Sequence, residues 1–261
     1  MKTIYQILNI NKNNVTFKVI PNDNDKIFWN NFIIGKWENY FFKIFKKIKN
    51  INDYIFIDVG ASNGCLSLYA ANFCKKVYSL EPDRRAFKFL KKNLKLNNKN
   101  IIPLNLALNV DNKIIKSTVG KDFSSINFST NEKFFKIRTI TFARLLKKYL
   151  KKEKFLLKID IEGYEFSLLN DNSFQTIIKI RKPPIYLAIH IGAGPLFEYK
   201  RAPYNFLQRF YNLYKTFCEY KILHKLLLNY KKIEINGVPS SKLFFLNFKY
   251  YRKDVDIFMY N

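Results

Sequence analysis

The sequence predicts an α/β protein with a mostly parallel sheet and helices on both of its faces. Between residues 54 and 190, short apolar runs rich in Ile, Val and Leu alternate with longer amphipathic segments, a pattern typical of strand–helix–strand units. The strand-like runs are apolar at nearly every position, as expected for strands that are buried on both faces. With 261 residues, 48% of them hydrophobic, the chain is long enough for one large core.

The elements follow in order after an N-terminal lead-in, residues 1–50, which contains a weakly alternating run and a segment with helical spacing. The main domain is expected over residues 51–261. In it the sequence predicts strands at 54–59, 76–80 and 101–108, with helices at 65–76 and 83–97 between them. Two alternating segments, 114–119 and 134–140, then share one connection, and Thr141 begins a helix over 142–152. Strands at 155–161 and 184–190 follow, and an antiparallel pair, 243–248 with 255–259, closes the sheet.

The stretch from residue 199 to 232 is crowded with Tyr, Phe and Lys and predicts a helical insertion on the substrate side of the domain. An amphipathic helix packed on the core is the favoured interpretation. A basic helix that lies on a membrane surface is the alternative, so peripheral membrane contact stays open.

The net charge of +26, from 46 basic and 20 acidic residues, is typical of proteins that bind polyanions. Most of the excess is lysine, however, and it accompanies an excess of Asn, Ile, Phe and Tyr along the whole chain. This pattern indicates a compositional bias, so the charge predicts no specific nucleic-acid partner.

Cysteine and histidine are scarce. The three cysteines form no CxxC pair, and with only two histidines neither a structural zinc site nor a disulfide framework is expected. No apolar run reaches the roughly 18 residues that span a bilayer. The N-terminal residues become polar too early for a signal peptide. We therefore expect a cytoplasmic protein without a transmembrane segment.

The first candidate binding motif, residues 57–64, joins a predicted strand to a predicted helix. Open α/β sheets bind ligands at such turns, where glycines such as Gly60 permit a tight turn and a close approach of the ligand. A dinucleotide site favours G-x-G-x-x-G, but the later glycines of that pattern are missing and Asp58 precedes Gly60 by two residues. A carboxylate there repels a pyrophosphate and attracts a sulfonium or ammonium group. The motif thus favours S-adenosylmethionine over a dinucleotide, with a plain strand–helix turn as the alternative.

Further acidic residues follow later strands. Glu81, followed by Pro82, ends the second strand, where its carboxylate can accept hydrogen bonds from both hydroxyls of a ribose. The segment KIDIEGYE, 158–165, carries three carboxylates, Asp160, Glu162 and Glu165, at the end of a buried strand. Helix capping explains one of these acids, and a base, a hydroxyl acceptor or a cation ligand explains the others. His190 ends the next strand, so it is a candidate catalytic residue as well as a candidate packed histidine.

These motifs, together with the segments IIPLNLAL and RTITFARLL, resemble the FkbM family of methyltransferases in the order in which they occur, from about Trp37 to His190. The resemblance implies the seven-stranded, Rossmann-like fold of class I methyltransferases. It also implies S-adenosylmethionine as cofactor and S-adenosylhomocysteine as product. Family members mostly methylate hydroxyls of sugars in surface glycans, glycolipids and macrolide-type products. The cofactor-binding residues that it implies are Asp58, Gly60, Ala61, Asn63 and Gly64 at the methionine end, Glu81 and Pro82 at the ribose, and Asn105 and Ala107 near the adenine.

The chain departs from the family pattern at Ala143, where relatives usually carry an acid, and at Ala188, where relatives commonly carry Glu or Ser. Neither position belongs to the cofactor loop.

The sequence therefore predicts an O-methyltransferase that acts on a sugar hydroxyl. His190 is the first candidate base, Asp160 orients it or the acceptor hydroxyl, and Glu162 is the third catalytic candidate. Asp160 and Glu162 are potential ligands of a divalent metal, but the sequence offers no complete ligand set, so no metal is predicted. The alternatives are an RNA methyltransferase that uses the basic surface and a non-catalytic binding protein on the same fold.

Overall fold

The computed structural model describes residues 6–21, 26–37, 39–119, 126–127, 134–161, 164–189, 206–243 and 255–261. Glu162 and His190, two of the three candidate catalytic residues, lie outside these ranges, as does most of the expected strand 243–248.

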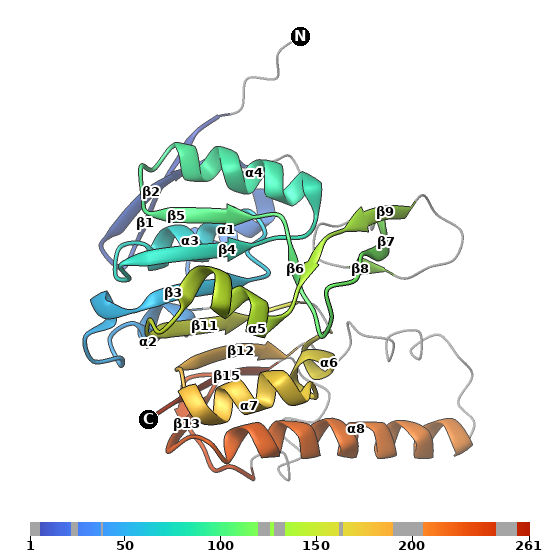
Figure 1. The fold of residues 1–261 in the computed structure, drawn as a ribbon. Helices are drawn as coiled ribbons and strands as arrows, with labels where there is room; N and C mark the ends of the chain where they lie inside the picture. Colours follow the sequence, from blue (N-terminus) through green and yellow to red (C-terminus); the bar gives the residue numbers. More distant parts are fainter. Residues whose placement is uncertain are drawn as a thin grey trace.

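The centre of the fold is an eight-stranded sheet with the strand order β14-β13-β15-β12-β11-β3-β4-β5 (Figure 1). Five neighbouring strands, from β12 to β5, run parallel, and β15 runs antiparallel between β12 and β13. The bounds of these strands are β3 Ile55–Val59, β4 Lys76–Leu80, β5 Ile101–Leu104, β11 Phe155–Ile159, β12 Ile185–Ile189, β13 Lys232–Ile235, β14 Val238–Pro239 and β15 Val255–Tyr260.

This arrangement confirms the predicted fold class, but three details differ from the prediction. The sheet has eight strands instead of seven because the two-residue strand β14 pairs with β13. The expected strand 101–108 is two strands, since the Leu106 N–H bonds to the Leu104 carbonyl in a tight turn that sends β6 (Ala107–Leu108) to pair with β10 (Thr139–Ile140). Finally, the sequence predicts that 255–259 pairs with 243–248, whereas β15 has β12 on one side and β13 on the other as its antiparallel partners.

Each face of the sheet is covered by its own hydrophobic cluster. Alternate strand residues such as Ile57 and Leu157 pack against helices α5 to α8, and the intervening residues such as Phe56 and Leu156 pack against the N-terminal segment and α3. Helices therefore cover both faces of the sheet in Figure 1. The helices are α1 Lys26–Ile33, α2 Phe41–Ile44, α3 Cys65–Ala70, α4 Arg84–Lys95, α5 Phe142–Leu145, α6 Glu165–Leu169, α7 Asn172–Arg181 and α8 Phe206–Leu227.

Three smaller β units accompany the central sheet. An N-terminal hairpin consists of β1 (Leu8–Lys12) and β2 (Val15–Val19), and it shares a hydrophobic cluster with α3. The two predicted alternating segments of the connection between β6 and α5 contain β7 (Ile115–Val119) and β9 (Phe134–Ile137), which pair with each other, and β8 (Ile126–Asn127), which the sequence does not predict, pairs with β7. The third unit is the pair of β6 and β10. As predicted, Thr141 caps α5, since its hydroxyl accepts a hydrogen bond from the Arg144 N–H at 3.3 Å.

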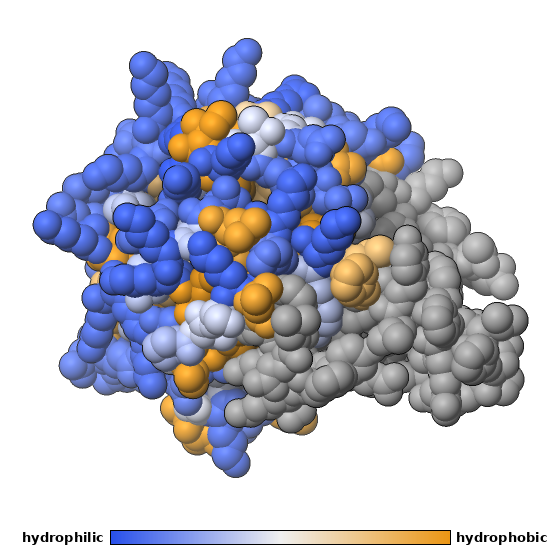
Figure 2. All heavy atoms as spheres, turned by 90° about the horizontal axis from the view of Figure 1, so that it is seen from below, coloured by the Kyte–Doolittle hydropathy of each residue, from blue (hydrophilic) through white to orange (hydrophobic). Residues whose placement is uncertain are grey.

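Helix α8 lies within the stretch for which the helical insertion is expected. Its C-terminal half packs into the core through Leu223, Leu226 and Leu227, whereas Phe217 is exposed. On the face seen in Figure 2, the side chains that are coloured are mostly hydrophilic, and apolar side chains form small, separate patches. In the described part of the chain, no helix is both long enough and apolar enough to cross a membrane.

Candidate functional site

The loop after β3 is held against two neighbouring strands at once. The N–H groups of Gly60 and Ala61 both donate to the Leu80 carbonyl, at 3.0 and 2.9 Å. Gly60 has φ +81°, and a Cβ atom at this position would lie 1.8 Å from the carbonyl oxygen of Asp160. Because no side chain fits there, only glycine lets the β3 loop pass this closely over the end of β11.

The second glycine of the loop fixes the start of α3. Gly64 has φ +87°, and a Cβ atom there would lie 2.5 Å from Leu90 Cδ1 of helix α4. Just before it, the Asn63 side chain accepts a hydrogen bond from the Cys65 N–H at 3.3 Å. Ser62 also has a positive φ, +47°, so the backbone between β3 and α3 turns sharply.

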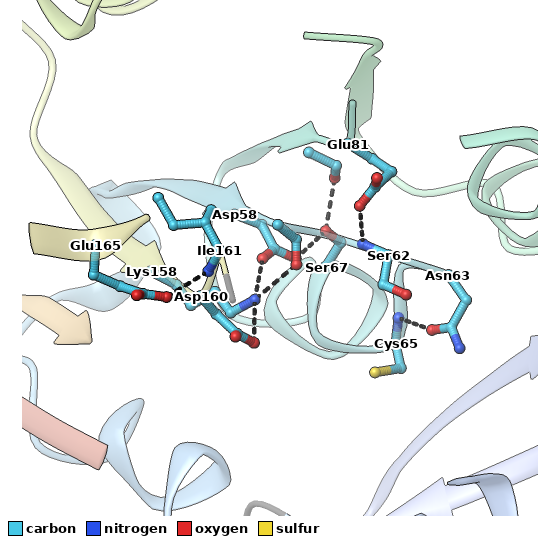
Figure 3. Close-up of polar contacts among 12 residues, drawn as sticks. Asp58, Ser62, Asn63, Cys65, Ser67, Glu81, Lys158, Asp160, Ile161 and Glu165 are labelled. Carbon is cyan, nitrogen blue, oxygen red and sulfur yellow. Dashed lines mark hydrogen bonds and ion pairs between the residues drawn. The ribbon is translucent and has the colours of Figure 1, made fainter. Parts of the chain in front are cut away.

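Glu81 stands beside this loop, at the end of β4 (Figure 3). Its Oε2 accepts a hydrogen bond from the Ser62 N–H, and its Oε1 accepts one from the Asp83 N–H, both at 2.8 Å. Burial raises the pKa of this carboxyl to about 7, although the two backbone N–H groups act in the opposite direction. The protein thus keeps a buried carboxyl group at the position where the sequence predicts a contact with ribose hydroxyls.

The loop after β4 is supported by Asn105, which follows β5. The Asn105 amide donates to the carbonyl oxygens of Glu81 and Pro82, at 2.8 and 3.1 Å. In the structure this side chain therefore holds the Glu81 loop in place. Ala107 lies two residues further on, in β6, and is partly buried.

Under the β3 loop, Lys158 joins two of the predicted acidic residues (Figure 3). Its Nζ atom lies 3.2 Å from Asp58 Oδ1 and 3.1 Å from Asp160 Oδ2, and it donates a hydrogen bond to the Gly60 carbonyl at 2.9 Å. The side chains of Asp58 and Lys158 are 0% and 3% exposed, whereas that of Asp160 is 17% exposed. This cluster carries two negative charges and one positive charge, and Asp160 is its member nearest to solvent.

Asp58 has a second buried partner, in α3. The Ser67 hydroxyl donates to Asp58 Oδ2 at 2.6 Å and lies 2.6 Å from the Ser79 hydroxyl. Since Ser67 has one hydroxyl hydrogen, Ser79 is the donor between the two serines. The direct contact between Asp58 and the cofactor stays a prediction, because these contacts of Asp58 lie inside the protein.

The predicted helix cap is not found at α6, where Tyr164 is the N-cap and its side chain makes no capping hydrogen bond. Glu165 is instead the first residue of this helix. It is fully buried, and its Oε1 accepts a hydrogen bond from the Ile161 N–H at 3.0 Å, just before α6. Two of the three acids in this segment thus lie in the described structure with different roles. Glu165 holds the backbone, and Asp160 reaches the surface beside the cofactor loop.

Lys158 is the residue of this site that the sequence prediction omits. A lysine inside an otherwise apolar strand run is the signal that indicates it, because a buried ammonium group needs charged or carbonyl partners. Its partners come from β3, from the loop after β3 and from the end of β11. Asp58 and Lys158 are register partners on adjacent parallel strands, so their side chains emerge on the same face of the sheet.

In the described ranges, no group of three or more His, Cys, Asp or Glu side chains is arranged to hold a metal ion. A cavity of about 750 Å³ lies at the opposite edge of the sheet, where its lining includes Lys75, Lys76, Tyr78, Tyr149 and Lys152. It is therefore separate from the loops that follow β3, β4 and β11.

Comparison with known proteins assigns the family. A profile of the methyltransferase FkbM domain matches residues 58–221, more than half of the chain. The chain belongs to the FkbM methyltransferase family. The match begins at Asp58 and includes Gly60, Glu81 and Asp160. It identifies the protein as a methyltransferase whose cofactor is S-adenosylmethionine.

More remote comparisons add little to this assignment. No curated protein matches the chain. Precorrin-6y C5,15-methyltransferase from Geobacter metallireducens GS-15 has a TM-score of 0.41 and 12% identity, with 86% of this chain and 88% of that chain covered. The fibrillarin/Nop5p complex gives 0.41 and 13%, with 84% and 79% covered. The tRNA m1G37 methyltransferase of M. jannaschii gives 0.39 and 14%, with 99% and 58% covered. TM-scores this low carry no argument about the substrate.

The side chains at this edge of the sheet fit the cofactor. The buried Glu81 carboxylate offers acceptors for a diol, and the cluster around Asp58 and Asp160 has an excess of one negative charge that suits a cationic group. When bound, S-adenosylmethionine supplies a methyl group that its sulfonium already activates. The protein's own contribution is to hold the loop after β3 through Lys158 and to hold the loop after β4 through Asn105.

We expect cofactor affinity to depend on the ionisation of Glu81. As the pH rises to about 7, the carboxyl loses its proton and becomes a stronger acceptor for hydroxyl groups, so affinity should rise and then level off. Glu81→Gln should lower the affinity roughly ten- to a hundredfold, the worth of a hydrogen bond to a charged group, and should flatten this part of the pH profile. Calorimetric titration with S-adenosylhomocysteine from pH 5.5 to 8.5 measures both effects.

The stability of the free protein should change in the opposite direction. Because burial raises the Glu81 pKa from 4.5 to about 7, the folded state binds a proton that the unfolded state has lost between these values. The contribution of this group to stability therefore falls as the pH rises through that window.

For cofactor binding, a pH profile of the affinity that is the same in Glu81→Gln as in the wild type would show that another group controls the affinity.

Proposed function

We propose that this methyltransferase transfers the methyl group of S-adenosylmethionine to a hydroxyl group of a sugar in a surface glycan or glycoconjugate. The supporting observation is the position of Asp160. It follows β11, its carboxylate is anchored by Lys158, and its side chain is 17% exposed beside the cofactor loop. A hydroxyl substrate needs an acceptor of this kind, because its oxygen must lose a proton as the new C–O bond forms.

In this proposal the acceptor hydroxyl donates a hydrogen bond to the Asp160 carboxylate, which orients the hydroxyl oxygen toward the methyl group. The proton leaves through this hydrogen bond to Asp160 and is passed on to His190, which follows the last residue of β12 in the chain. Glu162, three residues after the last residue of β11 in the chain, is a further candidate base. We place the reaction in the cytoplasm, with peripheral membrane contact if the acceptor is a glycolipid. In this proposal the positively charged protein binds no specific nucleic acid.

The test is methyl transfer from S-adenosylmethionine labelled in its methyl group to separated glycan and RNA fractions of the host cell. We expect label in the glycan fraction, as an alkali-stable methyl ether that acid hydrolysis releases on a monosaccharide. Asp160→Asn should remove this label. Glu153→Gln is the matched control, because Glu153 is an exposed carboxylate that pairs with Lys75 at the other edge of the sheet.

The alternatives are distinguished in the same experiment. Label that enters RNA and is released by ribonuclease would support an RNA methyltransferase. Label in neither fraction, from a protein that binds S-adenosylhomocysteine, would favour a binding protein on this fold. Either result would overturn the sugar proposal.

A further inference from the structure

Two asparagines, Asn93 in the last turn of α4 and Asn97 just after this helix, bind backbone groups in and directly after the N-terminal strand β2. Asn97 accepts a hydrogen bond from the Lys18 N–H at 2.7 Å and donates one to the Lys18 carbonyl at 2.6 Å. Four residues earlier, Asn93 accepts a hydrogen bond from the Ile20 N–H at 2.7 Å. The two amide side chains thus satisfy backbone groups of β2 and of the residue that follows it, as a neighbouring strand would.

Asn93 also reaches the cofactor loop. Its Nδ2 atom donates to the carbonyl oxygen of Asn63 at 2.8 Å, and the residue is 0% exposed. One buried amide therefore bridges Ile20, the residue that follows the hairpin, and the loop residue Asn63. The hairpin also packs on α3, the helix that this loop begins, because Phe17 and Val19 share a cluster with Leu66 and Tyr69.

We infer that the N-terminal hairpin is a working part of the cofactor site, and that Asn93 is the positioning residue that connects them. The hairpin, residues 8–19, lies outside the matched region 58–221, so the family assignment says nothing about this role. The physical reason is local. The Asn63 carbonyl is fixed by the Asn93 amide, which is itself fixed by the Ile20 N–H directly after β2, so the shape of residues 60–64 depends on the hairpin being in place.

The inference rests on the cofactor, not on the identity of the acceptor. If the loop is held in its binding shape through Asn93, loosening that contact reduces the fraction of molecules that are ready to bind. By linkage, a bound cofactor must in turn stabilise the contact between the hairpin and Asn93. Failure of the sugar proposal would leave both statements intact, because both concern binding in the absence of an acceptor.

The first test compares two chemically identical substitutions, Asn93→Asp and Asn97→Asp, at pH 8, where the new carboxylate is ionised. Each variant keeps the acceptor for β2 and replaces the donor by an oxygen. In Asn93→Asp that oxygen faces the Asn63 carbonyl, whereas in Asn97→Asp it faces the carbonyls of Lys18 and Asn93. We expect about a tenfold loss of affinity for S-adenosylhomocysteine in Asn93→Asp and less than a twofold loss in Asn97→Asp. Wild-type affinity in a folded Asn93→Asp variant, or the same loss of affinity in both folded variants, would overturn the inference.

The second test needs no substitution and decides the matter if Asn93→Asp does not fold. Amide hydrogen exchange of the wild-type protein is measured with and without saturating S-adenosylhomocysteine. The amide of Ile20, which bonds to Asn93, should exchange at least fivefold more slowly when the ligand is bound. The amide of Asn236, which follows β13 and bonds to the Asp256 carbonyl, lies four strands away from β3 in the sheet; it is the control and should slow less. Equal slowing at both amides, or none at Ile20, would contradict the inference.

Discussion

Lys158→Met should lower the free energy of unfolding by about 3–5 kcal/mol, which is typical when one partner of a buried ion pair is removed. The substitution leaves Asp58, which is fully buried, with Ser67 as its remaining described partner, and it also removes the hydrogen bond to the Gly60 carbonyl. Methionine has nearly the volume of lysine, so the loss reflects charge and hydrogen bonding more than packing. Urea unfolding measures it.

Two controls identify the cause of this loss. Lys154→Met removes an exposed lysine just before the same strand, and it should change stability by less than about 0.5 kcal/mol. The double variant Lys158→Met with Asp58→Asn should recover part of the loss, because it also removes the uncompensated carboxylate. A stability of Lys158→Met within 1 kcal/mol of the wild type, about the cost of an exposed change, would show that the cluster is not a buried ion pair in solution.

The sequence correctly places those parts of the site that depend on residues close together in the chain. The turn at Gly60 and the acid at Glu81 each follow a strand within one strand–helix unit, and a parallel sheet brings the ends of such units to one edge. The same argument places Asp160 there, after β11. The hydrophobic pattern is enough for these positions because it shows where each strand ends, and in a parallel sheet all of these ends lie at the same edge.

The remaining features depend on contacts between segments that are distant in the chain. The hydrogen bond from Lys158 to the Gly60 carbonyl joins residues 98 positions apart, and the contact between Asn93 and the Ile20 N–H joins residues 73 positions apart. An asparagine on a helix gives no sequence signal of such a partner, because the same residue type is common at exposed helix ends. Strand β13 is likewise missing from the prediction, because its four residues include a lysine and a glutamate.

Asp160→Asn should reduce turnover by about 10²–10⁴-fold, the usual worth of a positioned proton acceptor, and leave the affinity for S-adenosylhomocysteine within about threefold. The amide keeps the shape of the side chain but holds an acceptor hydroxyl less strongly. Protein stability should fall less than in Lys158→Met, because Asp160 is partly exposed and Lys158 keeps Asp58 as its partner. Turnover at saturating cofactor, calorimetric affinity and urea unfolding on one preparation separate these effects.

Asp53→Asn is the matched control, since Asp53 is an exposed carboxylate just before β3 and should leave turnover unchanged. His190→Ala completes the comparison. If His190 takes the proton and Asp160 orients the hydroxyl, both variants lose turnover, and in the wild type turnover falls as the imidazole is protonated below about pH 6.5. If His190→Ala is folded and fully active while Asp160→Asn is inactive, Asp160 itself is the base. Full activity of a folded Asp160→Asn variant would remove this carboxylate from the reaction and, with it, the observation that supports a hydroxyl acceptor at this site.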